Sequence, residues 1–236
     1  MKVEIWSDIV CPWCYIGKRR FEAARARFAH GDDIHLTWHS FELDPNADAV
    51  ATGDLAERLA AKYGMTVERA RAMQANMTQV AAEDGLNFRF DIARSGNTFD
   101  AHRLLHLAAE QGIQDAVKER FFKAYLTDGE SIGDRDTLVR VAAEAGLDPE
   151  AARATLESDA YAREVRADER RAAALGISGV PFFVIDEKYG ISGAQPADVL
   201  LDALEQAWDE SHPPAPLTVV GGGKGAACVG DECLVG

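Results

Sequence analysis

Two short segments near the start of the chain alternate between apolar and polar residues, a pattern that is typical of half-buried β-strands. Val3 and Ile5 carry the first alternation, and residues 34–38 carry the second. Between them, apolar side chains recur at helical spacing over residues 21–28, with basic residues on the other faces. Gly31 follows and is expected to end this helix. The pattern therefore predicts a strand, a helix and a second strand, in that order.

The middle of the chain shows only helical spacing. Thr66 and Thr98 each stand just before an apolar stripe and are expected to cap a helix. Asp148 followed by Pro149 fits an N-cap with proline at the first helical position. No alternating segment interrupts this region of the sequence, so we expect an all-helical insertion over residues 45–175.

Strand character returns in the segment GVPFFVIDEKYGISG. Residues 182–185 form an apolar run, residues 186–188 are expected to turn, and residues 189–192 give a second short strand. Apolar residues at helical spacing then predict a last amphipathic helix that ends near Trp208. The sequence therefore predicts a hairpin followed by a helix.

These elements assemble into an α/β protein: a thioredoxin fold with a large all-helical insertion and a flexible C-terminal tail. The thioredoxin-like domain is expected to be discontinuous, formed by residues 1–44 and 176–208. The tail, residues 209–236, contains the runs SHPPAP and GGGKG and carries a second cysteine pair.

The composition is that of a globular protein, with 47% hydrophobic and 27% charged residues among 236. A formal net charge of −14 argues against binding to nucleic acid or to anionic membranes. No apolar run approaches the ~20 residues of a membrane span, and charged residues stand where a signal peptide would need an apolar region. We therefore expect a cytoplasmic protein with no nucleic-acid and no membrane partner.

The four cysteines fall into two close pairs, Cys11/Cys14 and Cys228/Cys233. Four cysteines are too few to staple a chain of this length, and a core of this size does not need staples. In a reducing cytosol, such pairs point to redox chemistry or to metal binding rather than to static bridges.

The first pair stands where the first strand gives way to a helix. Unpaired N–H groups and the macrodipole of a helix N-terminus favour a thiolate, and in Cys-x-x-Cys enzymes the pKa of the first cysteine falls to roughly 3.5–7.5. Pro12 suits the first helical turn, and Trp13 is expected to be partly exposed beside the sulfurs. Cys11 is therefore the expected nucleophile. Cys14 is the expected resolving thiol, which closes a disulfide with Cys11 and releases the substrate.

A basic run follows the cysteines on the same helix. Residues 18–20 are Lys, Arg and Arg. We expect them to form a solvated helix face that gives some electrostatic help to the Cys11 thiolate.

A second feature is the proline that precedes the third strand. Pro181 in SGVPFF cannot donate to a strand ladder, and a cis Val180–Pro181 bond would cost only ~0.5–1 kcal/mol. A cis bond would turn the backbone of Val180 outward as a partner for an extended substrate peptide. The residues alone leave this arrangement and an ordinary trans edge proline equally open.

Five blocks of the sequence carry a resemblance to a known family: DIVCPWCYIGKRRFE, FELDP, NTFDAHRL, GVPFFVID and YGISGAQP, in this order. Together they resemble the DsbA-like thioredoxin-fold oxidoreductases, and among these the FrnE-type members, over roughly residues 1–208. The resemblance implies thiol–disulfide oxidoreductase or disulfide isomerase activity. It also implies that Pro181 is a cis proline that faces Cys11 and Cys14.

The resemblance further implies which residues shape the substrate site. The block NTFDAHRL resembles a segment that faces the active-site cleft, which makes Asn97 and His102 candidates for substrate contact. Ser192 and Gln195 are candidates for lining the groove, because relatives with smaller substrates bind glutathione near there. The expected partners are proteins with disulfides or thiols, and a redox partner such as a thioredoxin or glutathione system. No cofactor and no metal is obligatory, and glutathione or another thiol reductant would serve as a co-substrate.

Two other functions stay open. A glutathione-dependent isomerase or transferase of small aromatic molecules has the same fold, although such relatives typically carry serine in place of the cysteine pair. A thiolate metal-binding protein would gather Zn²⁺ or a softer ion, which requires the tail to fold back onto Cys11 and Cys14. His102 and His106 lie one helical turn apart, but the sequence offers no obvious third ligand beside them.

The tail pair has its own possible role. Cys228 and Cys233 in CVGDEC are expected to approach each other through a turn at Gly230 and Asp231. A flexible linker of roughly 19 residues spans on the order of 22–26 Å, which is enough to reach the first pair. An auxiliary redox relay, a staple at the end of the chain and two incidental cysteines are equally compatible with the sequence.

Overall fold

The computed structural model describes residues 1–213, 227–229 and 232–234. A mixed sheet with the strand order β2–β1–β3–β4 lies at its centre. β1 and β2 are parallel, whereas β3 is antiparallel to both of its neighbours. This is the sheet of a thioredoxin fold, as the sequence pattern predicts. The strands are β1 (Lys2–Ser7), β2 (His35–Ser40), β3 (Phe182–Ile185) and β4 (Tyr189–Ser192).

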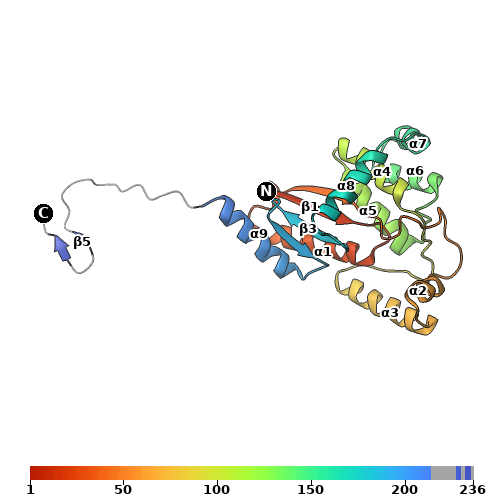
Figure 1. The fold of residues 1–236 in the computed structure, drawn as a ribbon, viewed down its shortest axis with the longest axis horizontal. Helices are drawn as coiled ribbons and strands as arrows, with labels where there is room; N and C mark the ends of the chain where they lie inside the picture. Colours follow the sequence, from red (N-terminus) through yellow and green to blue (C-terminus); the bar gives the residue numbers. More distant parts are fainter. Residues whose placement is uncertain (214–226, 230–231, 235–236) are drawn as a thin grey trace.

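Two helices cover one face of this sheet. α1 (Pro12–Arg27) follows β1, and α9 (Ala197–Ser211) follows β4. Figure 1 shows the two helices next to each other at one end of the described fold. Their buried side chains and those of the strands form one apolar cluster that includes Val3, Ile5, Phe21, Phe28, Phe183, Leu200 and Leu204.

The segment between β2 and β3 is helical, as predicted. Its helices group at the far end of the sheet from α9 (Figure 1). They are α2 (Leu55–Tyr63), α3 (Val67–Glu83), α4 (Phe99–Glu110), α5 (Gln114–Lys123), α6 (Arg135–Glu144), α7 (Pro149–Glu157) and α8 (Ala162–Ala174), and α5 continues into a π-helical turn at Ala124–Asp128.

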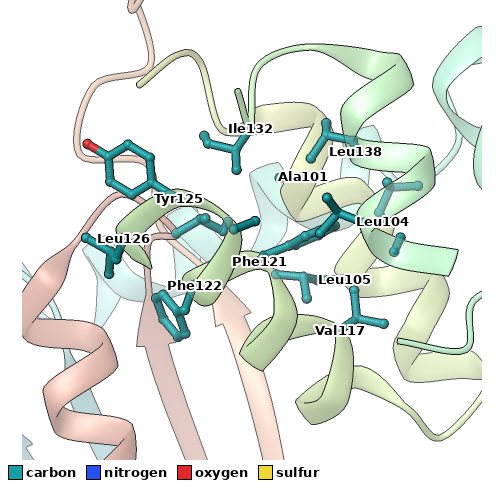
Figure 2. Packing of buried hydrophobic residues seen from close by; sticks show 14 of the residues in the cluster. Ala101, Leu104, Leu105, Val117, Phe121, Phe122, Tyr125, Leu126, Ile132 and Leu138 are labelled. Carbon is teal, nitrogen blue, oxygen red and sulfur yellow. The ribbon is translucent and has the colours of Figure 1, made fainter. Parts of the chain in front are cut away.

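A second apolar core lies inside this helical segment. Figure 2 shows Phe121 of α5 beside Leu104 and Leu105 of α4, whereas Phe122 points away from them. The first turn of α1 belongs to the same core, because Cys14 and Tyr15 are buried against it. The helical segment therefore encloses the start of α1.

Two of the predicted helix caps are confirmed and one is wrong. The hydroxyl of Thr66 accepts from the N–H of Arg69 at the start of α3, and Asp148 caps α7 with Pro149 in its first turn. Thr98 occupies the N-cap position of α4, but its side chain makes no capping bond. The preceding Asn97 does so instead, since its carbonyl oxygen accepts from the N–H of Phe99 at 2.9 Å.

The ends of the first and last helices also differ from the sequence pattern. α1 ends at Arg27, and Gly31 instead begins a short 3₁₀ helix, Gly31–Asp33. α9 continues past Trp208 to Ser211. The indole of Trp208 stacks between the rings of His30 and His212, each at 3.9 Å between ring centres. These contacts explain why the helix continues for another turn.

A network of charges joins the sheet to α8. His39 of β2 lies between two carboxylates: Nδ1 is 2.6 Å from Asp168 of α8, and Nε2 is 2.8 Å from Glu4 of β1. Arg171 of α8 donates to both oxygens of Glu4, and the N–H of Ser40 donates to Asp168 at 2.8 Å. This network fixes the last helix of the helical segment against the sheet.

Cys228 and Cys233 lie directly opposite each other in an antiparallel ladder between β5 (Ala227–Val229) and β6 (Glu232–Leu234). The predicted turn at Gly230 and Asp231, and the linker that would give the tail its flexibility, lie outside the described residues. In the part of the chain that the structure describes, every helix is too short or too polar to cross a membrane.

We expect Asp168→Asn to lower the free energy of unfolding by about 3 kcal/mol, because it removes the charge that holds His39 and His106. Burial raises the pKa of Asp168, but hydrogen bonds from His106 and His39 outweigh it and hold this pKa well below its usual range. The stabilisation is therefore complete above the ordinary aspartate pKa of about 3.9 and is lost as the pH falls further. Urea unfolding of the wild type and of Asp168→Asn, at neutral and at acidic pH, measures this difference in the free energy of unfolding. A variant as stable as the wild type at neutral pH would contradict the role of Asp168.

Candidate active site

The N-terminus of α1 presents the first cysteine pair. Cys11 is the N-cap residue, with extended backbone, and Pro12 occupies the first helical turn, where its missing N–H costs no bond. Both cysteines are free thiols. Cys11 retains 4% of its surface and Cys14 retains none, whereas the indole of Trp13 between them is 40% exposed. The two cysteines therefore differ in access, and Cys11 is the more accessible of the two.

The sheet brings a second segment against Cys11. β1 and β3 pair so that Trp6 lies opposite Phe182, which places the residues before β3 beside those that follow β1. The Cys11 Sγ lies 3.5 Å from the carbonyl oxygen of Val180. The Val180–Pro181 peptide bond is cis. The structure thus brings Cys11 against Val180, which is 169 residues later in the chain, and against the adjacent Pro181.

Helix α1 approaches Pro181 closely at a glycine. A Cβ built on Gly17 would lie 2.9 Å from Cγ of Pro181 and 3.4 Å from Phe183. On its other side, the carbonyl oxygen of Pro181 accepts from the N–H of Gly193 at 2.8 Å. Gly17 is therefore required for space, and it lets the helix that carries the cysteines contact the proline loop.

A buried carboxylate lies beneath the cysteines. Asp8 is fully enclosed; it accepts from the N–H of Leu43 at 2.8 Å, and its second oxygen lies 3.4 Å from Nε2 of His102 on α4. Burial raises the pKa of Asp8, but the hydrogen bond and charge of His102 outweigh it and hold the pKa below its usual value. Burial lowers the pKa of His102 itself. The pair keeps a negative charge inside the protein, next to the first turn of α1.

The second cysteine lies in a less favourable environment for a thiolate. Burial raises the pKa of the Cys14 thiol well above its ordinary value, and the adjacent sulfur of Cys11 raises it further. The charge of Lys118 on α5 acts in the opposite direction. Cys14 therefore needs help to ionise, while it is well protected from bulk solvent.

The basic run on α1 does not form the solvated face that its sequence predicts. Lys18 is buried and pairs with Glu22, Asp115 and Glu119. Arg19 also pairs with Glu119, so both cations are used to join α1 to α5. The prediction of a solvated face is wrong because carboxylates of α5, 100 residues away in the sequence for Arg19 and Glu119, pair with these cations.

The structure separates the four predicted substrate-contact residues. Asn97 caps α4 and donates to the carbonyl of Pro45 at 3.2 Å. His102 is fully buried against Asp8, so it cannot touch a substrate directly, and that expectation is wrong. Ser192 is exposed, and Gln195 donates to its carbonyl at 2.8 Å in the loop that contacts Pro181.

No metal cluster forms around the predicted histidine pair. His102 faces Asp8, whereas His106 lies 3.1 Å from Asp168 in the separate network beside β2. Among residues 1–213 and the two short tail strands, no group of three or more His, Cys, Asp or Glu side chains could hold a metal ion.

Comparison with known proteins agrees with this geometry. The pattern that defines the DSBA-like thioredoxin domain family matches residues 2–205. The chain belongs to this family. The chain is similar to a probable DsbA oxidoreductase, SCO1869 from Streptomyces coelicolor, whose crystal structure is known. The two sequences are 48% identical, the TM-score is 0.85, and the alignment covers 100% of this chain and 99% of SCO1869.

Two other proteins are more distantly similar to this chain. The uncharacterized protein YwbO of Bacillus subtilis is 28% identical over 204 residues, which are 86% of this chain and 94% of that protein. The cytosolic disulfide reductase DsbM from Pseudomonas aeruginosa, solved with GSH, is 19% identical with a TM-score of 0.62, over 88% of this chain and 99% of its own. At this level of identity, DsbM shows a shared fold alone.

The sequence analysis missed two buried charged residues, Asp8 and Lys118. Asp8 looked like an ordinary polar residue at the end of a strand, although it stands inside the block that carries the cysteines. Lys118 stands in a charged stretch of a helix and carries no signal of burial. Only the packing of α4 and α5 over the first turn of α1 reveals either residue.

We expect Gly17→Ala to destabilise the protein. The added methyl would overpack the contact with Pro181 at a cost of roughly 1–3 kcal/mol, more than the roughly 1 kcal/mol that alanine contributes to a helix. Urea unfolding measures the difference, with Gly179→Ala as a control because a Cβ there meets open space. If Gly17→Ala proves at least as stable as the wild type, the close contact with Pro181 is not required.

Proposed function

We propose that this protein is a thiol–disulfide oxidoreductase and disulfide isomerase that acts on protein disulfides, with Cys11 as the nucleophile and Cys14 as the resolving thiol. The observation that carries the proposal is the position of Cys11. Cys11 occupies the N-cap position of α1, retains 4% of its surface, and its sulfur lies 3.5 Å from the carbonyl oxygen of Val180. Unpaired N–H groups at that helix end stabilise a thiolate there.

The reaction follows from the difference between the two sulfurs. The Cys11 thiolate attacks one sulfur of a substrate disulfide, and the other substrate sulfur leaves as a thiolate. Cys14 then attacks Cys11, the mixed disulfide breaks, and the substrate departs reduced while the protein keeps an intramolecular disulfide. The same steps in reverse oxidise a dithiol, and return of the substrate thiolate to a different sulfur isomerises a disulfide.

Protein substrates fit the surroundings of Cys11. The Val180 carbonyl beside the sulfur is a backbone acceptor of the kind that pairs with an extended peptide. Trp13 and Leu43 are large apolar side chains with 40% and 43% of their surface exposed. Trp13 follows the end of β1, and Leu43 follows the end of β2. Apolar surface next to a backbone acceptor suits an unfolded polypeptide with an exposed disulfide.

The same proposal includes the reductant and the compartment. A glutathione or thioredoxin system would recycle the pair in the cytoplasm, because Cys11 is open to a second thiol after each turnover. The name of DsbM, a cytosolic disulfide reductase solved with GSH, supports this choice. Ser192 and Gln195, in the loop tied to Pro181, are the residues that would meet a bound glutathione.

We assign the tail pair an auxiliary role, in which Cys228 and Cys233 exchange their disulfide with Cys11 and Cys14. Their opposed positions in the β5–β6 ladder support a dithiol that closes on itself. Turnover of a Cys228→Ser/Cys233→Ser variant relative to the wild type measures this contribution.

We expect Cys11→Ser to abolish both insulin reduction and refolding of scrambled ribonuclease, because it removes the thiol at the N-terminus of α1 that attacks the substrate. Cys14→Ser should keep the first attack but accumulate mixed disulfides with the substrate, because the resolving sulfur is gone. Nonreducing electrophoresis and mass spectrometry detect the trapped species. Thermal unfolding controls for loss of fold in either variant.

The substrate class is decided in the same experiment. If neither protein assay shows turnover above background while a glutathione-dependent isomerisation of a small aromatic compound does, the protein-disulfide function is wrong. An active Cys11→Ser variant would contradict the role of Cys11 for either class of substrate.

A further inference from the structure

One buried cation has no partner. The ammonium group of Lys118 is fully enclosed and makes no hydrogen bond with any of the described residues. Two aromatic rings lie near its Nζ: the ring centres of Phe122 and Trp38 are 5.0 and 5.5 Å away. Lys18, the other buried lysine of this region, is held by three carboxylates. A buried ammonium without such partners is costly, and proteins rarely keep one without use.

The groups that face Lys118 come from every element packed around it. The ammonium form of Lys118 is favoured by negative charge on four groups: Cys14, Asp8, Cys11 and Asp115. The charge of Lys118 in turn lowers the pKa of His102 on α4. Burial is the stronger effect, so the pKa of Lys118 is lowered to about 8. Lys118 can therefore hold or release a proton near neutral pH, which an exposed lysine cannot do.

Cys14 is the neighbour that needs such a group. It has no contact with bulk solvent, and burial opposes its ionisation. Asp8 is a poor acceptor for its proton, because the pKa of this carboxyl is held below its usual value. Lys118 makes no hydrogen bond with the described residues, and its ammonium stands on a flexible four-carbon side chain.

We propose that Lys118, from the helical segment, is the proton acceptor for Cys14 in the resolving step. When Cys11 holds the substrate in a mixed disulfide, the Cys14 S–H gives its proton to the neutral amine of Lys118. The Cys14 sulfur attacks the Cys11 sulfur, a new disulfide forms, and the bond from Cys11 to the substrate breaks. The substrate sulfur leaves with the electron pair of that bond, so the two thiols are oxidised and the substrate disulfide is reduced.

The proton is returned when the protein is recycled. A reducing thiolate attacks Cys11, and Cys14 leaves as a thiolate. The Lys118 ammonium then gives the proton back to Cys14. The proton passes between two buried groups and back, so the step requires no channel to solvent. This explains why both Cys14 and Lys118 are fully enclosed.

The inference rests on the Cys11/Cys14 exchange of the proposed function, but not on its protein substrates. The probe is therefore the chromogenic disulfide dithio-bis-nitrobenzoate under single turnover. Attack by Cys11 releases one coloured thionitrobenzoate anion, and resolution by Cys14 releases a second one. A chain that is inactive on proteins but shows both phases would refute the protein-disulfide function and leave this inference standing.

In the wild type, the rate of the second phase should rise with pH and level off near pH 8, where Lys118 titrates. Lys118→Met keeps the length of the side chain without a basic group. It should slow the second phase on the order of 100-fold at neutral pH, as is typical for loss of a general base, and leave the first phase within a few-fold of wild type.

Two further variants separate proton transfer from charge and from structure. Lys118→Arg keeps the positive charge but cannot lose a proton at ordinary pH, so it should be as slow as Lys118→Met in the second phase. Lys123→Met, an exposed lysine on the same helix, should behave as wild type.

A second phase at the wild-type rate in Lys118→Met or Lys118→Arg would overturn the proposal. The wild type alone also tests it, which matters if a variant does not fold. If its second phase keeps rising tenfold per pH unit to about pH 10, where ordinary lysine titrates, Lys118 is not the acceptor.

Discussion

The antiparallel pairing of β1 with β3 is the constraint on which the site depends. β1 ends just before Cys11, and β3 begins just after Pro181, so their register fixes the distance between the cysteine and the proline loop. The sulfur of Cys11 lies 3.5 Å from the Val180 carbonyl as a direct result. Gly17 then allows α1 to pack closely on Pro181, and the N–H of Gly193 holds the other side of that loop. A shift of one residue in this pairing would move every side chain of β3 to the opposite face.

The helical segment makes the two cysteines chemically different. Its core encloses the first turn of α1, which leaves Cys11 with 4% of its surface accessible and Cys14 with none. It also supplies His102 and Lys118, whose charges act on Asp8 and on the sulfurs. A thiolate that attacks a substrate must be reachable, whereas a resolving thiol only has to reach its neighbour. Burial therefore does not prevent Cys14 from acting as the resolving thiol, provided that a neighbouring group accepts its proton.

The features that the sequence predicted correctly depend on near neighbours. The Cys-x-x-Cys helix start, the 186–188 turn, and the caps at Thr66 and Asp148 each arise within a few residues. The features that it missed depend on contacts between distant segments: Lys18 is paired by α5, and Asp8 is covered by α4 and α5. No local pattern distinguishes a buried charge from a solvated one, because the difference lies in the partner. The misassigned cap at Thr98 is a smaller case, in which two adjacent capping residues competed and Asn97 made the bond.

The most direct test of the account is to map which sulfur first forms a mixed disulfide. The protein would be treated with less than one equivalent of oxidised glutathione, quenched with acid, and digested for mass spectrometry. Because Cys11 stands at the helix N-terminus and retains 4% of its surface, whereas Cys14 is fully enclosed, glutathione should be found on Cys11, followed by an internal Cys11–Cys14 disulfide. Glutathione found first on Cys14, or equally on both, would contradict the assignment of nucleophile and resolving thiol.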